Sequence, residues 1–185
     1  MSPPTPNRVV LPGPIGDRPY RVLFICTGNI CRSPMAEVIT RSLARTTPLA
    51  DGSTLGDHLE ISSAGTGPWH EGEPMHPSAA VSLDRGGYPQ ESHVAHQFVA
   101  SDLGRIDLMI ALDRRHRQML LGLGADPDRL VLLRSFDKAA GAAADVPDPY
   151  YGDQAVFDEC RDMIAAACTG LVGLLAANWD SLWAA

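Results

Sequence analysis

Residues 21–37 read Arg-Val-Leu-Phe-Ile-Cys-Thr-Gly-Asn-Ile-Cys-Arg-Ser-Pro-Met-Ala-Glu. The apolar run at 22–25 is long enough for one buried strand, and Gly28 and Asn29 are residue types that tolerate the positive φ of a tight turn. Apolar side chains then recur at helical spacing, which predicts a helix over 34–45. The segment therefore reads as a strand, a short loop and a helix.

The loop after this strand is suited to binding an anion. Successive backbone N–H groups turn inward there, and the helix, with Ser33 as its candidate N-cap, adds the positive end of its dipole. These groups stabilise a thiolate at Cys26, at the carboxyl end of the strand. The guanidinium of Arg32 has a fork of donors that fits two oxygens of a phosphate. The spacing Cys-x5-Arg therefore predicts a nucleophile and a clamp that face one bound dianion.

The string from Cys26 to Pro34 resembles the signature of the low-molecular-weight protein tyrosine phosphatases, Cys-x-Gly-Asn-x-Cys-Arg-Ser-Pro. The larger tyrosine phosphatases usually carry a His before the nucleophile, where this chain has Ile25. The resemblance, to a bacterial member of the small family, implies that Cys26 is the nucleophile and Arg32 the phosphate clamp. It also implies that the phosphate is held by the loop residues Thr27, Gly28, Asn29, Ile30 and Cys31.

Length and composition limit the class of protein. The chain has 185 residues, 45% of them hydrophobic, which suits one domain with a full core. The net charge of −7 argues against a nucleic-acid surface. No apolar run approaches membrane-spanning length, no signal peptide is recognisable, and the few cysteines suit a reducing compartment. We expect a cytoplasmic monomer without nucleic-acid or membrane partners, and export without a signal peptide stays open.

The N-terminal residues differ in character from the rest. Residues 1–19 are rich in proline and hold little that can pack, so we expect a flexible tail. Docking of Val9, Val10 and Leu11 is the alternative. Residues 20–185 are expected to form the phosphatase domain.

Strand-like and helix-like segments alternate along the remaining chain. Strands are expected at 58–63, 106–112 and 130–133, and helices at 77–84, 113–121 and 153–178. This alternation predicts a single α/β domain, a four-stranded parallel sheet with helices on both faces and the phosphate-binding loop after the first strand. Ligands bind beyond the carboxyl ends of the strands in such sheets, and Cys26 falls at such an end.

Two segments outside the loop also resemble the family. Trp69, after a Ser-Ala-Gly stretch, matches an aromatic residue that flanks the cleft and stacks on the substrate ring; the alternative is a Trp that covers the core. Residues 92–97 resemble a His-x-Ala-Arg segment, which implies that His93 braces Asn29. His96 stands where an Arg is common, and the two histidines lack further ligands, so no metal is expected. We assign no role to His58, His70, His76 and His116.

The segment 145–153 reads Asp-Val-Pro-Asp-Pro-Tyr-Tyr-Gly-Asp. Cleavage of a phosphate ester needs a proton for the departing oxygen and later a base that activates water. Asp148 lies between two prolines, which stiffen its backbone. The resemblance to the family's Asp-Pro-Tyr-Tyr loop implies that Asp148 is this acid and base, and that Tyr150 and Tyr151 wall a deep slot. The two tyrosines are also candidate sites for a tyrosine kinase.

The implied reaction is hydrolysis of phosphotyrosine in proteins through a cysteinyl-phosphate. Cys26 attacks phosphorus, Asp148 protonates the tyrosine oxygen, and Arg32 with the loop amides holds the equatorial oxygens. The Ser33 hydroxyl bonds the sulfur and improves it as a leaving group. No metal or cofactor is required, because the guanidinium and amides supply positive charge. Cys31 is either a reversible disulfide partner of Cys26 or a small residue packed under the loop.

Three other functions compete with this interpretation. Arsenate reductases of the same fold use a further cysteine pair, and residues 90–112 contain no Cys. Protein arginine phosphatases typically carry Thr where this chain has Ile30, and they lack the paired tyrosines. A binding module without catalysis would not need both Cys26 and Asp148. The sequence therefore favours a tyrosine phosphatase, with an arginine phosphatase or arsenate reductase as the alternative.

Overall fold

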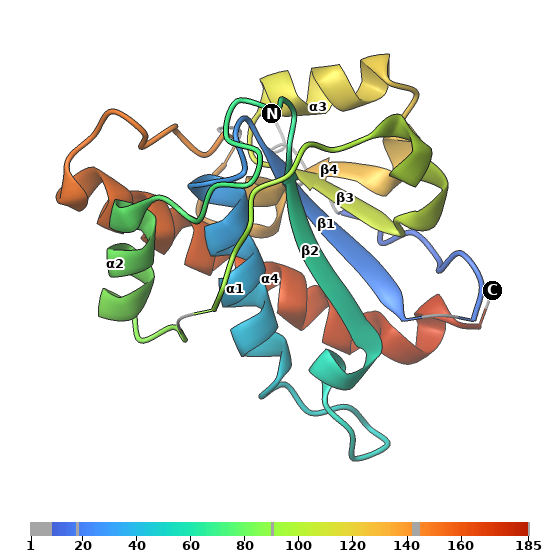
Figure 1. Ribbon diagram of the computed structural model, residues 1–185. Helices are drawn as coiled ribbons and strands as arrows, with labels where there is room; N and C mark the ends of the chain where they lie inside the picture. The colour runs from blue at the N-terminus through green and yellow to red at the C-terminus, as the bar shows by residue number, and fades with distance from the viewer. Residues whose placement is uncertain (1–8, 18, 90, 142–144, 185) are drawn as a thin grey trace, which may run out of the picture.

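The computed structural model describes residues 9–17, 19–89, 91–141 and 145–184. Its four strands are parallel and lie side by side in the order β2-β1-β3-β4 (Figure 1). They are β1 (Tyr20–Cys26), β2 (Leu59–Gly65), β3 (Leu108–Ala111) and β4 (Leu130–Leu132). The expected four-stranded parallel sheet is confirmed.

β1 is an inner strand, paired on both sides and covered on both faces. Successive side chains of a strand point to opposite faces, so the apolar run divides between two cores. Val22 and Phe24 join the larger core, whereas Leu23 and Ile25 join the smaller one. A strand buried in this way has to be apolar at nearly every position, which explains the continuous run in the sequence.

The helices lie on both faces of the sheet, as expected. The larger core is covered by α1 (Arg32–Ala44), α2 (Pro77–Arg85) and α4 (Gln154–Leu182), and the smaller core by α3 (Arg114–Gly122) (Figure 1). Side chains such as Ile39 of α1 and Ile164 of α4 are fully buried in the larger core. Short 3-10 helices occur in the connections, at Leu55–His58, Ala100–Arg105, Pro127–Arg129 and Leu133–Phe136.

The first helix begins earlier than the sequence predicts. α1 starts at Arg32 with Cys31 in the cap position, and no side chain caps it. The expectation that Ser33 is the N-cap is therefore wrong. Its hydroxyl turns away from the helix end and lies 3.0 Å from the sulfur of Cys26. The contact with the Cys26 sulfur therefore takes the place of the expected capping hydrogen bond.

The last helix ends later than the sequence predicts. α4 runs to Leu182, because the buried positions continue through Leu175, Trp179 and Leu182. The polar Asn178, where the expected helix ends, keeps its helical place by donating to the Leu174 carbonyl, at 2.8 Å. Among the described residues α4 alone is long and apolar enough to cross a membrane, which by itself is weak evidence, since a core helix passes the same test. Its apolar side packs on α1, α2 and the larger core.

Residues 9–17 run from a cleft shared with α3 and β4 to the amino end of the sheet. Val9 and Leu11 pack on the larger core, while Val10 is exposed. The Tyr20 hydroxyl donates to the Pro12 carbonyl at 3.0 Å, and Asp107 accepts from the backbone N–H of Ile15 at 2.6 Å. Of the tail predicted for 1–19, residues 1–8 and 18 lie outside the described residues, and the boundary at residue 19 stays a prediction.

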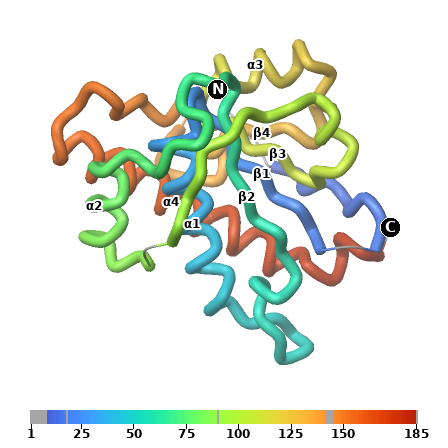
Figure 2. The backbone as a smooth tube through the Cα atoms, in the orientation of Figure 1, coloured from blue at the N-terminus to red at the C-terminus, as the bar shows by residue number. Residues whose placement is uncertain are grey.

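The strand register brings loops distant in sequence to one edge. Cys26 pairs with Gly65, so the loops after β1 and β2 leave the sheet side by side, as the tube in Figure 2 shows. The backbone of Val146 then donates to the Leu112 carbonyl just beyond β3, at 2.8 Å. This bond holds the 145–153 segment beside the phosphate loop.

Two glycines of α4 test how closely this helix approaches its neighbours. A Cβ at Gly170 would stand 2.1 Å from the carbonyl oxygen of Phe136, whereas a Cβ at Gly173 would meet nothing within 4 Å. We expect Gly170→Ala to lower the free energy of unfolding by about 1–3 kcal/mol through overpacking. We expect Gly173→Ala, the matched control, to raise it by about 0.5–1 kcal/mol through helix propensity. Urea unfolding measures both, and equal effects of the two changes would contradict this packing.

Candidate active site

The sulfur of Cys26 lies at the base of a loop that follows β1. Cys26 is the last residue of the strand and is almost fully buried. Asn29, also buried, has a φ of 56°, in the left-handed region that Asn tolerates better than most residues. This conformation turns the loop back toward the strand end, so that Arg32 returns to the same place as Cys26.

Asn29 holds the loop through both ends of its amide. Its Nδ2 donates to the hydroxyls of Ser33 and Ser63, each at 2.9 Å, and its Oδ1 accepts from the backbone N–H of His96 at 3.1 Å. The backbone carbonyl of Asn29 lies 2.6 Å from Nε2 of His93. The contact inferred for His93 is therefore present, and Asn29 has partners on three segments of the chain.

The direction of these hydrogen bonds follows from the groups involved. An amide NH2 only donates, so the Ser33 oxygen accepts from Asn29 and keeps its own proton for another acceptor. The sulfur of Cys26 lies 3.0 Å away, while the other acceptor, a backbone carbonyl, lies at 3.5 Å. Ser63 likewise accepts from Asn29 and donates to Glu37 at 2.5 Å. The network thus offers a donated proton to the sulfur.

Arg32 is the most heavily partnered charge in the site, although only 3% of its side chain is exposed. Nη1 donates to Asp113 at 3.0 Å and to the Val146 carbonyl at 3.1 Å. Nη2 donates to Asp148 at 2.8 Å and to the Thr27 hydroxyl at 3.3 Å. Nε is buried and has no hydrogen-bond partner among the described residues. Because an unpaired buried donor is costly, this N–H fits an oxyanion bound in the cleft.

Asp148 reaches Arg32 from far along the chain. Its carboxylate is 49% exposed, and its Oδ1 accepts from the backbone N–H of Tyr150 at 3.3 Å. Pro147 before it contributes a carbonyl to the thiol of Cys160, at 3.8 Å. The loop is therefore fixed from below by α4, with the carboxylate at the cleft surface.

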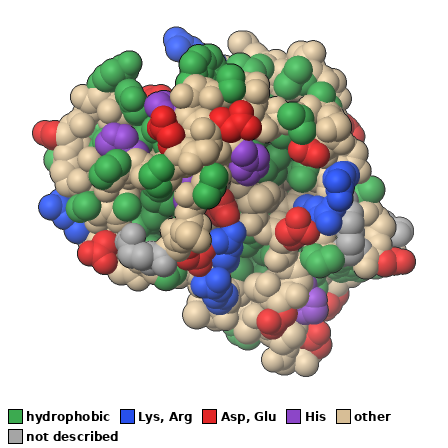
Figure 3. Space-filling model, viewed as in Figure 1, with side chains coloured by type: hydrophobic (Ala, Val, Ile, Leu, Met, Phe, Trp, Pro, Cys, Tyr) green, Lys and Arg blue, Asp and Glu red, His purple; other side chains and the backbone are tan. Residues whose placement is uncertain are grey.

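A cleft of about 350 Å³ connects these groups. Its lining residues are Cys26, Thr27, Gly28, Ile30, Cys31, Arg32, Trp69, His70, Asp148, Tyr150 and Tyr151. Three of the predicted site residues lie outside that lining, namely Asn29, Ser33 and His93, and they support the loop from behind. Figure 3 shows hydrophobic side chains and histidines gathered on the upper left of the face drawn there.

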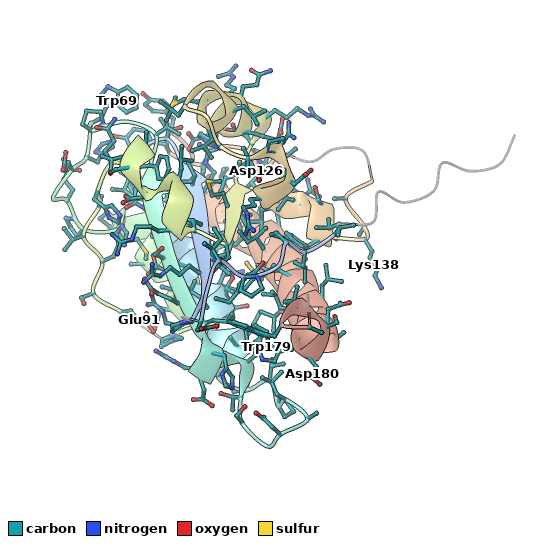
Figure 4. All side chains as sticks on the ribbon, turned by 90° about the vertical axis from the view of Figure 1, so that its right-hand side faces the viewer. Trp69, Glu91, Asp126, Lys138, Trp179 and Asp180 are labelled. Atoms are coloured by element: carbon teal, nitrogen blue, oxygen red, sulfur yellow. The ribbon has the colours of Figure 1, made fainter. Side chains whose placement is uncertain are left out.

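Aromatic side chains form the outer wall of the cleft. Tyr150 packs against His76 and His70, with ring centroids 5.7 and 5.8 Å apart. Tyr151 meets Tyr150 edge-on at 4.9 Å and is 97% exposed. Trp69 is 65% exposed and lies at the outer edge of the molecule in Figure 4. The alternative in which Trp69 covers the core is therefore excluded.

Sequence reasoning missed several residues of the site. His70 closes one wall, and a Cβ at Gly28 would stand 2.6 Å from its ring. Asp113 and His116 lie behind Arg32, where Asp113 also caps α3 by accepting from the backbone N–H of His116 at 2.9 Å. In the sequence, this pair could have been found only by its spacing. An Asp directly after a strand is followed three residues later by a His.

Burial sets the protonation of three groups near Cys26. It lowers the pKa of His116 from 6.5 to about 4, against the opposing effect of the Asp113 charge. It raises the pKa of the Cys31 thiol far above its ordinary value and that of Cys160 to about 12. His116 is therefore neutral, and Cys31 and Cys160 remain thiols, at neutral pH. Within the described ranges, no cluster of His, Cys, Asp or Glu side chains could hold a metal ion.

The fold and the composition of the cleft together are those of a small protein phosphatase. The family model for low molecular weight phosphotyrosine protein phosphatase matches residues 21–181. A low molecular weight protein-tyrosine-phosphatase of Streptomyces coelicolor is 47% identical over 157 residues, which are 83% of this chain and 92% of the relative. The chain belongs to the low-molecular-weight protein tyrosine phosphatase family, a family of hydrolases.

Solved structures agree with this assignment. YfkJ from Bacillus subtilis superimposes with a TM-score of 0.77 at 33% identity, covering 88% of this chain and 98% of that one. The arginine phosphatase YwlE superimposes with a TM-score of 0.69 at 26% identity, covering 84% and 95%. The same fold is therefore found in proteins named for two different substrates.

The neutral state of His116 makes the fold sensitive to acid. The imidazole takes up a proton near pH 6.5 in the unfolded chain but only near pH 4 in the folded one, so stability falls as the pH drops below 6.5. We expect this group to remove about 2 kcal/mol from the free energy of unfolding between pH 7 and pH 5. In His116→Gln, whose side chain does not titrate, the drop in the free energy of unfolding between pH 7 and pH 5 should be smaller by this amount. Urea unfolding at both pH values decides this, and an identical pH dependence in the two proteins would contradict it.

Proposed function

We propose that this chain hydrolyses phosphotyrosine in proteins, with Cys26 as nucleophile, Arg32 as phosphate clamp and Asp148 as general acid and base. The observation that carries the proposal is the surroundings of Arg32. Its buried guanidinium lines one cleft with the Cys26 sulfur, keeps an unpartnered Nε, and touches Asp148 at 2.8 Å. A tetrahedral dianion seated over the sulfur satisfies that donor.

The first step forms a bond between sulfur and phosphorus. The thiolate of Cys26 attacks in line, and the bond to the tyrosine oxygen breaks. The backbone amides of the loop and the Arg32 guanidinium stabilise the three equatorial oxygens, where negative charge is spread. Asp148 gives its proton to the departing oxygen, so that a neutral tyrosine leaves.

The second step releases phosphate. Asp148, now a carboxylate, takes a proton from a water molecule that attacks phosphorus, and the bond to sulfur breaks. The proton of Ser33, directed at Cys26, stabilises the returning thiolate. Asn29 supports this direction because its amide occupies the acceptor side of the Ser33 hydroxyl.

Asp148 changes partner during the cycle. In the structure its carboxylate is ion-paired with Arg32 and partly exposed. Phosphate oxygens at the clamp compete for the same Nη2, and they disfavour a second negative charge nearby. The carboxyl group then swings toward the leaving oxygen as the protonated acid. Two prolines and the bond from Val146 to Leu112 keep the loop backbone in place during this change.

The cleft favours an aromatic substrate. Tyr150 is held by two histidine rings, and Trp69 and Tyr151 stand exposed beside it, so a phenyl ring entering the slot meets aromatic faces. The relative at 47% identity is named a tyrosine phosphatase, whereas the arginine phosphatase is 26% identical. Tyr151, at 97% exposure, is the more accessible of the two tyrosines to a kinase.

Substitution of the nucleophile and the acid gives different kinetic results. Cys26→Ser removes the thiolate and should abolish turnover. Asp148→Asn keeps the shape but cannot transfer the proton, so kcat/KM for phenyl phosphate, which reports the first step alone, should fall by about 10²–10⁴-fold. The loss should be much smaller on 2,4-dinitrophenyl phosphate, whose leaving group needs no proton. Asp162→Asn, at an exposed carboxylate of α4, is the matched control, and an equal loss on both substrates would exclude Asp148 as the acid.

A panel of substrates separates the competing activities. We expect turnover of phosphotyrosine peptides at least 10-fold above that of phosphoarginine peptides, and no thiol-dependent reduction of arsenate. Tyr150→Ala removes the fixed wall and should raise KM for phosphotyrosine while leaving phosphoarginine nearly unchanged. Preferential turnover of phosphoarginine, or of arsenate, would replace the proposed substrate.

A further inference from the structure

Four side chains form a closed ring around the clamp. Arg32 Nη2 donates to the Thr27 hydroxyl at 3.3 Å, and that hydroxyl lies 2.9 Å from Nε2 of His116. Nδ1 of His116 lies 3.0 Å from Oδ1 of Asp113, within ion-pairing distance though outside hydrogen-bond geometry. Oδ2 of Asp113 accepts from Arg32 Nη1 at 3.0 Å and closes the ring.

The protons in this ring can be placed. A guanidinium only donates, so the Thr27 oxygen accepts from Arg32 and has its own proton left to give. The nearby Nε2 of His116 is the acceptor for that proton. This requires the tautomer protonated at Nδ1, which also places an N–H rather than a lone pair beside the Asp113 carboxylate. This one arrangement of protons gives each of the three hydrogen bonds a donor and an acceptor, and leaves the Nδ1 proton of His116 in ionic contact with Asp113.

Burial keeps His116 in this state. Its side chain is 4% exposed, and desolvation lowers the pKa of the imidazole to about 4. The charged groups that act on it are Asp113, Asp145 and Asp148, which favour the protonated form, and Arg32, which disfavours it. A protonated ring would present an N–H to Thr27 and remove the acceptor. The neutral imidazole is therefore the form that fits the four-residue network.

We propose that His116 is a positioning residue of the phosphate clamp, acting through Thr27 and Asp113 to fix the plane of the Arg32 guanidinium. It touches neither substrate nor sulfur. By accepting the Thr27 proton, it turns a lone pair of Thr27 toward Nη2, and it packs against the carboxylate that holds Nη1. The proposal rests on the proposed function, because it takes Arg32 to be the clamp.

A fixed guanidinium matters most when charge spreads over the equatorial oxygens. A misplacement of about 1 Å at a binding group can cost on the order of 10²-fold in rate. A tilted Arg32 guanidinium should weaken binding of the tetrahedral phosphate ester less than it weakens binding of the trigonal-bipyramidal transition state. Loss of His116 should therefore lower kcat more than it raises KM.

Two variants separate the acceptor from the bulk of the ring. His116→Gln keeps a neutral acceptor for the Thr27 proton and should retain kcat within about threefold. His116→Phe keeps a planar ring without the acceptor, and kcat for phosphotyrosine peptide should fall about 10-fold or more. Inhibition by vanadate, a trigonal-bipyramidal mimic, should weaken by a similar factor, whereas inhibition by inorganic phosphate should change little. A role limited to packing would affect both anions equally.

A double-mutant cycle tests the route through Thr27. Thr27→Val removes the hydroxyl and keeps the shape, so it should lower kcat in the wild type by several fold. In the His116→Phe background the same change should leave kcat almost unchanged, because the hydrogen bond from Thr27 to His116 is already lost. Additive losses would overturn the proposal. Thr27→Val alters no residue of the core. If His116→Phe folds poorly, the loss of kcat in Thr27→Val alone still tests the contact.

His58 provides the matched control. Its Nε2 lies 2.8 Å from the Ser53 hydroxyl, the same pair of groups, but it precedes β2 at the end of the sheet opposite to Cys26. His58→Phe should leave kcat and vanadate inhibition unchanged. If the wild type is active and Cys26→Ser is inactive while His116→Phe keeps full kcat, the positioning role alone fails. If the wild type hydrolyses no phosphotyrosine, the proposed function itself fails.

Discussion

The active site depends on the burial of one permanent positive charge. The guanidinium of Arg32 is almost inaccessible to water, and removing such a charge from water is expensive unless it is paired and hydrogen-bonded. The chain supplies the carboxylates of Asp113 and Asp148 and a backbone carbonyl. The Nε of Arg32 has no partner in the part of the chain that the structure describes. Under the proposed function, this donor is the one left for an oxygen of the bound phosphate.

The sheet topology explains how these partners meet. In a parallel sheet all carboxyl ends lie at one edge, so Cys26, Gly65 and Leu112 deliver three loops to the same place. Backbone hydrogen bonds anchor the loops at this edge, from Thr66 to Cys26 and from Val146 to Leu112. The acid loop is held in this way through Val146, and its aromatic residues then pack on the loop after β2.

Local patterns predicted the sheet and the phosphate loop, because apolar strands and a Cys-x5-Arg loop are written in consecutive residues. The helices on both faces followed from the alternation of strands and helices, whereas the strand order was not predicted. Ser33 was expected both to cap the helix and to bond the sulfur of Cys26; the cap was wrong, whereas the structure places the hydroxyl 3.0 Å from the sulfur. His116 was missed because its importance arises from Thr27 and Asp113, and their meeting exists only after folding. Helix and strand propensities reflect residues that are close in sequence. The contacts of Ser33 and His116 join different elements, so such propensities do not predict them.

The ion pair between Arg32 and Asp148 has a consequence for selectivity among small anions. Any incoming anion has to displace a carboxylate that is tethered beside the guanidinium and therefore present at a high effective concentration. A singly charged carboxylate or halide offers the guanidinium no more than Asp148 already does. A doubly charged phosphoryl group offers more charge and additional oxygens for the loop amides. Under the proposed function, the tethered carboxylate therefore favours doubly charged over singly charged anions at the guanidinium.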